Sequence, residues 1–381
     1  MIFASCASST EPPIGVYVHV PFCACPCAYC AFYKAIPGRT IIESYLQALK
    51  SEWALRYRGE PIETIFFGGG TPSILSAKQL EAIRRIFPDE LPFLKEWTIE
   101  CSPGTVTRDR LAAMRNMGVT RISMGVETFD EKFLKILNRR QTLRQVLEAY
   151  ELARGFSFDV NLDLMFALPG QRLYHWKADL QRAIDLAPGH LSTYCLTLEG
   201  DSQFAKNYRN KMLPAESGGE KFHRLASELL RAAGYEHYEV SNFAQQGKRC
   251  LHNVRTWQMN DWLGIGPSAA SQYGSRRFRN VSDLTRWMTG IRAGSPDEED
   301  ICAVDAKLLA QDKIIFGLRM REGIYPPESM DMISQHACVQ LFEKWCESGY
   351  MKCKDGIYHP TERGLLLADA LAKKFLLLNG N

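Results

Sequence analysis

The sequence predicts an α/β fold: a partial (β/α)6 barrel followed by a smaller α+β, winged-helix-like domain at the C-terminal end. Short apolar, β-branched runs alternate with amphipathic segments about six times over the first two-thirds of the chain. Such βα repeats imply parallel strands with right-handed crossovers. Polar motifs follow almost every run, and barrels carry their sites at the C-terminal ends of their strands. This placement favours a barrel over an open sheet.

The individual elements follow from the same pattern. The predicted buried strands are Val16–Val20, Thr64–Phe67, Trp97–Cys101, Ile122–Val126, Val160–Leu168 and Leu191–Leu198. The predicted helices between them are Ile41–Arg56, Ala77–Ile86, Arg108–Met117, Glu131–Leu137 joined to Leu143–Ala153, and Tyr174–Asp185. After them we expect a helical excursion over Gly200–Gly234, another strand over Tyr235–Phe243, and a loop region rich in glycine and tryptophan over His252–Ser271.

The acidic segment Ser295–Asp300 marks a predicted domain boundary. The elements expected beyond it are helices over Ala306–Arg319, Met330–Cys346 and Glu362–Leu378, and a short strand over Ile357–His359. The predicted organisation is therefore an N-terminal tail (1–14), the barrel (15–200), an extension (201–295) and a C-terminal domain (301–381).

Composition limits the class of protein. Hydrophobic residues make up 46% of the chain and charged residues 23%, as in ordinary globular proteins. The formal net charge of +3, without a dense basic run, argues against a nucleic-acid partner. No apolar stretch reaches the ~20 residues of a membrane-spanning helix, and Met1–Pro13 lacks the features of a signal peptide. We therefore expect a cytoplasmic protein, with peripheral membrane association left open.

A cysteine-rich loop directly follows the first predicted strand. Cys23, Cys27 and Cys30 have the spacing C-x3-C-x2-C, and Cys25 lies among them. Three thiolates can hold three irons of a [4Fe–4S] cluster and leave the fourth open to a cofactor such as S-adenosylmethionine. A zinc site with Cys25 as the fourth ligand is the alternative, although its spacing is tighter than zinc loops use. The other eight of the twelve cysteines are expected to be small buried hydrophobes.

Further polar groups follow the later strands. A glycine run leads into Thr71, and three glycines allow close backbone approach to a carboxylate or amine, although a tight turn would use them too. Glu100 and Glu127 end the third and fourth strands, and Asp163 lies within the fifth. Buried carboxylates are costly unless they are paired or bind a ligand. Their shared position favours recognition of a nucleoside cofactor over a ring of structural salt bridges.

Together these residues resemble the radical S-adenosylmethionine superfamily. Within it they are similar to the oxygen-independent coproporphyrinogen III oxidase family and its heme-chaperone branch. The resemblance runs from about Gly15 to beyond Gly364. The motifs that carry it are Tyr17–Cys23, Gly68–Ser73, Arg121–Glu127, Asn161–Met165, Leu168–Gln171 and Tyr238–Ala244.

The resemblance implies a role for each matching residue. The cluster ligands would be Cys23, Cys27 and Cys30. The residues that match contacts to the cluster-bound S-adenosylmethionine are Tyr17, Gly69 and Glu100. The residues that match a second S-adenosylmethionine site of the oxidase are Tyr29, Gly70, Thr71, Glu127, Arg139 and Asp163. Glu127 stands where the family usually has glutamine, which would alter binding at the second position.

Two features favour the chaperone branch. The oxidase has a further cysteine two residues after its third ligand, where this chain has Phe32, and it has a longer segment before its cluster loop. The chaperone has a His-Asn-x-x-Tyr-Trp motif linked to heme, and His252–Trp257 matches it except for Thr256. The motif implies His252 as an axial ligand of heme iron, with a structural histidine as the alternative. Against this, the Asn138–Gln141 segment looks more like the oxidase.

Two functions remain in view. The first is a chaperone that binds heme and delivers it to an acceptor hemoprotein, with a reductant protein as electron donor. The second is an oxidase that decarboxylates coproporphyrinogen III by radical chemistry. The sequence leaves open whether the protein is an enzyme.

Overall fold

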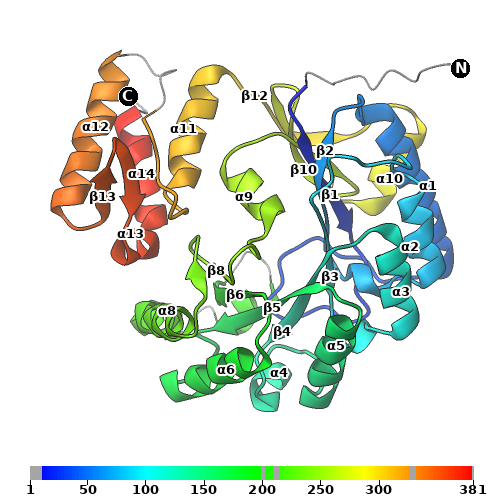
Figure 1. Ribbon diagram of the computed structural model, residues 1–381. Coiled ribbons are helices and arrows are strands. Elements are labelled where there is room, and N and C mark those ends of the chain that lie inside the picture. Colours follow the sequence, from blue (N-terminus) through cyan, green and yellow to red (C-terminus); the bar gives the residue numbers. More distant parts are fainter. Residues whose placement is uncertain (1–10, 199–201, 209–213, 327–331, 380–381) are drawn as a thin grey trace, which may run out of the picture.

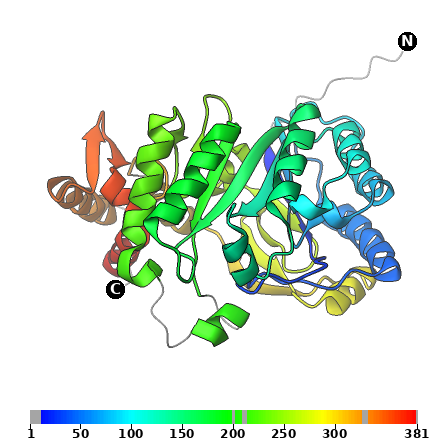
Figure 2. The same ribbon diagram turned by 90° about the horizontal axis from the view of Figure 1, so that it is seen from below.

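The computed structural model of the chain describes residues 11–198, 202–208, 214–326 and 332–379. Most of the predicted tail, and the predicted helix limits at Gly200 and Met330, lie outside the described residues. The described part holds a curved sheet of twelve strands, covered on its outer face by helices, and a separate small sheet near the C-terminal end (Figure 1). Figure 2 shows the same arrangement from below.

Six consecutive parallel strands form the centre of the large sheet, in the order of the sequence. They are β1 (Ile14–Val20), β2 (Ile62–Gly69), β3 (Glu96–Cys101), β4 (Arg121–Glu127), β5 (Asp159–Phe166) and β6 (His190–Cys195). The helices that connect them are α1 (Arg39–Arg56), α2 (Ala77–Arg84), α3 (Arg108–Met117), α4 (Glu131–Ile136), α5 (Leu143–Gly155) and α6 (Leu173–Leu186). The predicted partial barrel is confirmed.

The two faces of these strands differ in chemistry. Because side chains alternate along a strand, Val16, Val18 and Val20 of β1 share the outer face, and all three are fully buried in the main core. Tyr17 and His19 lie on the inner face, with Phe66 and Gly68 beside them in β2. The helices therefore bury an apolar layer outside the sheet, and the polar groups line the inside.

The segment after β6 extends this sheet at both edges. Strands β7 (Glu236–His237) and β8 (Asn242–Ala244) join β6, while β9 (Trp262–Ile265) pairs in parallel with β1 and leads to β10 (Ala270–Tyr273), β11 (Arg276–Asn280) and β12 (Glu298–Ala303). The helices of this segment are α7 (Gln203–Tyr208), α8 (Pro214–Ala232), α9 (Leu251–Trp257) and α10 (Leu284–Arg292).

Two local predictions about this segment are wrong. Tyr235–Phe243 forms two short antiparallel strands, because the chain turns between His237 and Asn242 and pairs with itself. His252–Ser271 contains helix α9 and strands β9 and β10, since β9 completes the open side of β1. The predicted boundary segment Ser295–Asp300 overlaps strand β12, which pairs with β11 as far as Ala303.

The C-terminal part has its own small core. Its elements are α11 (Ala306–Gly317), α12 (Met332–Glu347), the hairpin strands β13 (Met351–Lys354) and β14 (Ile357–Pro360), α13 (Glu362–Leu366) and α14 (Ala368–Asn379). Ile314, Phe342 and Trp345 are buried at its centre. The predicted short strand over Ile357–His359 is confirmed as β14, whereas its hairpin partner β13 was not predicted. Within the described ranges, no helix combines the length and apolarity needed to cross a bilayer.

Candidate functional site

A cavity of about 700 Å³ opens at the C-terminal ends of the parallel strands. The structure brings eleven of the thirteen predicted site residues together in its wall. They are Cys23, Cys27, Tyr29, Cys30, Gly69, Gly70, Thr71, Glu100, Glu127, Arg139 and Asp163. Residues more than 130 positions apart thus share one site, as expected because parallel strands end at the same side of a sheet.

The cysteine loop is anchored at several points. Ala28 donates its backbone N–H to Leu137 at 3.2 Å, and its carbonyl accepts from Phe204 of α7 at 3.0 Å. The Asn138 side chain donates to the carbonyl of Pro26 at 3.0 Å. The thiols of Cys23, Cys27 and Cys30 are free, and the Cys23 thiol lies 3.5 Å from the Thr71 hydroxyl. Three free thiols therefore line the cavity without belonging to a disulfide.

The glycine run packs directly against the start of this loop. The Gly70 N–H donates to Val20 at 2.8 Å, and a Cβ on Gly70 would lie 2.7 Å from backbone atoms of Val20 and Pro21. Gly69 has a positive φ of 99°, and a Cβ there would lie 2.4 Å from the His19 ring. A side chain at Gly69 or Gly70 would push the glycine run away from the end of β1 and the start of the cysteine loop. The close approach of these segments therefore requires glycine at both positions.

Glu100 is a partly buried carboxylate in the cavity wall that lacks a cationic partner among the described residues. Within the described ranges it accepts a hydrogen bond from the Gly69 N–H at 3.2 Å. Burial, and secondarily the charge of Asp163, raise the pKa of Glu100 to about 8. A buried carboxylate in this state favours a ligand that brings positive charge. The ammonium and sulfonium groups of S-adenosylmethionine meet this requirement, so the residues present fit the cofactor.

Glu127 and Arg139 form a buried ion pair across the cavity wall. Arg139 also donates to the carbonyl of Gly125 at 3.1 Å, and Glu127 has a positive φ of 67° at the end of β4. Burial opposes the charge on Arg139, but the charges of Glu127, Tyr29 and Cys27 and the hydrogen bond to Glu127 together outweigh it, so the pKa of Arg139 is raised. The pair neutralises one of the three acidic groups in the cavity and leaves Glu100 and Asp163.

Asp163 is held by a polar network inside the barrel. It accepts from Ser123 Oγ at 3.0 Å and from Asn161 Nδ2 at 2.8 Å. Burial, followed by the charge of Glu127, raises the pKa of Asp163 to about 6. Near neutral pH, the carboxylate is therefore ionised and able to accept bonds from a ligand.

Two predicted residues lie outside the cavity wall. Tyr17 is on the inner face of β1, stacks on Phe66 with ring centroids 6.3 Å apart, and contacts His19 Nδ1 at 3.3 Å. His252 lies in α9 at the other end of the strands, near Gly15 and Thr64. His252 was predicted to lie in a loop, but it lies within α9, is 7% exposed, and has its Nδ1 2.9 Å from the Thr64 hydroxyl.

Sequence reasoning missed several residues in the cavity wall. Tyr194 of β6 lines it, and so do Ser123 and Gln141. Gln141 donates to the carbonyls of Gly125 and Val126, at 3.0 Å and 3.1 Å. The period-two alternation of β6 was the available signal for Tyr194, because it places alternate residues on the inner face. Ser123 and Gln141 lie inside recognised motifs, but only their contacts reveal a role.

Comparison with known proteins identifies the family. Residues 17–183 match the model of the radical SAM superfamily. The chain is 31% identical to the heme chaperone HemW of Lactococcus lactis, over 96% of this chain and 98% of that one. It is 38% identical to HemW of Escherichia coli over 68% and 70%. The structure of the Escherichia coli coproporphyrinogen III oxidase HemN superimposes with a TM-score of 0.83 at 22% identity, covering 96% of this chain and 90% of that one.

The fold and the match therefore define a radical SAM protein with a HemN-like two-domain architecture. Within that superfamily, the chain belongs to the heme chaperone HemW family. Membership of the superfamily implies a [4Fe–4S] cluster and S-adenosylmethionine as cofactors.

Proposed function

We propose that this protein binds heme and delivers it to acceptor hemoproteins, and that it holds a [4Fe–4S] cluster and S-adenosylmethionine in the cavity. The similarity to heme chaperones over nearly the whole chain is the observation that carries this proposal. The convergence of three free thiols and an unpaired buried carboxylate in one cavity supports the cofactor part of it.

Cys23, Cys27 and Cys30 would bind three irons of the cluster as thiolates and leave the fourth iron for S-adenosylmethionine. When bound, the reduced cluster supplies an electron to that cofactor. Glu100 would accept its positively charged groups, and the backbone at Gly69 and Gly70 allows its close approach. Thr71 and Tyr29 lie beside the cysteines in the same wall. Asp163 and the Glu127–Arg139 pair would bind polar groups further along the cavity.

Helix α9 supplies the proposed heme contact. Burial lowers the pKa of His252 to about 4, so its imidazole is neutral, which is the form that binds metals. Nδ1 is engaged with Thr64, and no partner is found for Nε2 among the described residues. Trp257, at the end of the same helix, stacks on Phe316 of α11 with centroids 5.8 Å apart. Movement of α9 would therefore involve both the barrel and the C-terminal part.

The second candidate is the coproporphyrinogen III oxidase reaction. The overall similarity to HemN shows a shared fold, and the Asn138–Gln141 segment favours this candidate because Arg139 and Gln141 both line the cavity. An electron-donor protein, a cytoplasmic location and peripheral membrane association remain predictions under either function.

The deciding experiment is an anaerobic heme titration of protein with an intact cluster. A saturable Soret band, followed by transfer of the heme to an apo-hemoprotein, would support the chaperone. The same preparation is then given reductant, S-adenosylmethionine and coproporphyrinogen III, with an active oxidase as the positive control. Failure to bind heme rejects the chaperone, and absence of a vinyl product rejects the oxidase.

A further inference from the structure

A continuous chain of buried hydrogen bonds crosses the inside of the barrel from the cavity to helix α9. At the cavity end, Asn161 Nδ2 donates to Asp163 Oδ1 at 2.8 Å. Asn161 Oδ1 contacts His190 Nδ1 at 2.6 Å, and His190 Nε2 contacts the Tyr238 hydroxyl at 2.8 Å. At the other end, the Tyr238 oxygen accepts from the backbone N–H of Cys250, the residue directly before α9, at 3.3 Å.

The direction of each bond follows from the groups involved. Both amide hydrogens of Asn161 are used, toward Asp163 and toward Ser123 Oγ at 2.8 Å, so its Oδ1 accepts and His190 Nδ1 carries a proton. Burial, followed by the charge of Arg121, lowers the pKa of His190 well below its usual value, so the ring is neutral and Nε2 accepts. The Tyr238 hydroxyl therefore donates to Nε2. Every donor in the chain points from α9 toward Asp163.

The three middle members of the chain are shielded from water, whereas Asp163 at its end lines the cavity. Asn161, His190 and Tyr238 are each 1% exposed. In such surroundings, successive hydrogen bonds polarise and strengthen one another, so that altering the bond at one end changes the strength of the next bonds along the chain. The first turn of α9 is also held by Glu96, which accepts hydrogen bonds from the N–H groups of Leu251 at 2.9 Å and His252 at 3.1 Å.

We propose that His190 and Tyr238 are positioning residues, which orient Asp163 through Asn161 and couple occupation of the cavity to the position of helix α9. Neither residue lines the cavity, and neither belongs to the predicted cofactor contacts. The inference rests on the proposed function, in which S-adenosylmethionine binds in the cavity and α9 contributes to heme binding. It adds a physical link between those two places.

The test compares Tyr238→Phe with Tyr235→Phe in protein loaded with its cluster. Tyr238→Phe removes one oxygen atom and breaks the chain at two bonds. Tyr235→Phe is the matched control, because its hydroxyl is also buried but donates to Pro188 at 2.7 Å outside the chain. Equilibrium dialysis gives the affinity for S-adenosylmethionine, and hydrogen–deuterium exchange mass spectrometry gives the protection of residues 249–258 with and without it.

In the unaltered protein, S-adenosylmethionine should slow exchange in residues 249–258. Tyr238→Phe should weaken its binding about fivefold, a typical size for coupling between sites, and abolish that change in exchange. Tyr235→Phe should leave both measurements unchanged. If Tyr238→Phe is poorly folded, His190→Gln takes its place. It breaks the chain at another link and should have the same effect on affinity and exchange.

The proposed coupling is contradicted if Tyr238→Phe keeps both the affinity for S-adenosylmethionine and the exchange response of residues 249–258. It is equally contradicted if Tyr235→Phe loses both to the same extent. It is also wrong if the unaltered protein binds S-adenosylmethionine and heme without any change at residues 249–258, a result that leaves the proposed function intact. If the unaltered protein binds neither ligand, the proposed function fails, and the coupling fails with it.

Discussion

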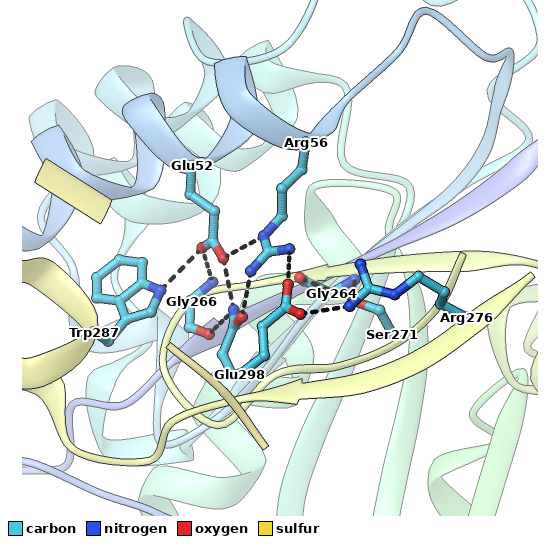
Figure 3. A network of polar contacts seen from close by, with 9 residues as sticks. Glu52, Arg56, Gly264, Gly266, Ser271, Arg276, Trp287 and Glu298 are labelled. Atoms are coloured by element: carbon cyan, nitrogen blue, oxygen red, sulfur yellow. Dashed lines mark hydrogen bonds and ion pairs between the residues drawn. The ribbon is translucent and has the colours of Figure 1, made fainter. Parts of the chain in front are cut away.

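The indole nitrogen of Trp287 donates a hydrogen bond to the carboxylate of Glu52 at 3.1 Å, which joins α10 to α1 across 235 positions of sequence (Figure 3). Glu52 is fully buried and also accepts from the Gly266 N–H at 2.7 Å, Asn280 Nδ2 at 2.7 Å and Arg56 Nε at 3.0 Å. A single carboxylate thus ties the segment after β6 to the first helix of the barrel.

Replacement of this carboxylate by an amide should destabilise the fold. Each oxygen of Glu52 accepts two hydrogen bonds, so the amide nitrogen of Glu52→Gln would face two donors whichever way it turned. Buried donors without acceptors cost about 1–3 kcal/mol each, so we expect the free energy of unfolding to fall by about 2–4 kcal/mol. Chemical denaturation measures it.

The control for this change is Glu43→Gln, on the same helix. Glu43 pairs with Arg39 in an exposed ion pair, and such pairs contribute about 0–1 kcal/mol. If Glu52→Gln and Glu43→Gln lowered the free energy of unfolding equally, the buried network around Glu52 would not be what holds the segment after β6 in place.

The three predicted cluster ligands should be separable from their neighbour Cys25. Cys23→Ala, Cys27→Ala or Cys30→Ala should each abolish the broad brown absorbance and the acid-labile sulfide of the reconstituted protein, because each removes one thiolate ligand. Cys25→Ala should leave both largely intact, since the hydrogen bonds found for the Cys25 thiol among the described residues are long ones to Asn138, at 3.8 Å and 4.0 Å. A colourless Cys25→Ala protein, or zinc without sulfide in the reconstituted material, would contradict the assignment.

The raised pKa of Glu100 predicts an unusual dependence of stability on pH. Since the pKa is about 8 in the folded protein and near 4.5 when unfolded, the folded state binds more protons between these values. The contribution of Glu100 to stability is therefore fully present below about pH 4.5 and is lost as the pH rises toward about 8. Glu100→Gln should flatten this slope in the cofactor-free protein and raise the free energy of unfolding at pH 8 by about 1–2 kcal/mol.

Denaturation of both proteins at pH 5, 6, 7 and 8 measures this difference. The same substitution should weaken binding of S-adenosylmethionine, because it removes the negative charge that would meet the cationic groups. A variant that is more stable at pH 8 and binds the cofactor less well would fit both statements. Unchanged stability profiles would show that Glu100 is already ionised or solvated in the cofactor-free protein.

The role of His252 can be tested without reference to activity. If its Nε2 binds heme iron, His252→Ala should weaken heme binding about tenfold or more, equal to about 1.4 kcal/mol, and shift the Soret maximum. His336→Ala, which removes an exposed histidine of α12, is the control for non-specific binding by surface imidazoles. An unchanged titration for His252→Ala, together with lower stability, would assign the ring a structural role against Thr64.

The sequence by itself determined the parts of this protein that depend on neighbouring residues. The spacing of Cys23, Cys27 and Cys30 places three thiols in one short loop whatever surrounds it. The alternation of apolar runs and amphipathic segments led to six parallel strands and their helices, because period two and period 3.6 are properties of a single segment. The positions of Glu100 and Glu127 at the ends of strands, and of Asp163 within a strand, followed from that alternation.

Only the tertiary structure decided the features that depend on distant partners. Three features join positions separated by 188 or more residues: the pairing of β9 with β1, the contact of His252 with Thr64, and the bonds that Glu52 accepts from Gly266, Asn280 and Trp287. No local periodicity encodes such contacts, since they arise when separate segments pack together and satisfy each other's buried polar groups. The difference between Glu127, which pairs with Arg139, and Glu100, which has no cationic partner among the described residues, has the same origin: identical side chains acquire different partners from the fold around them.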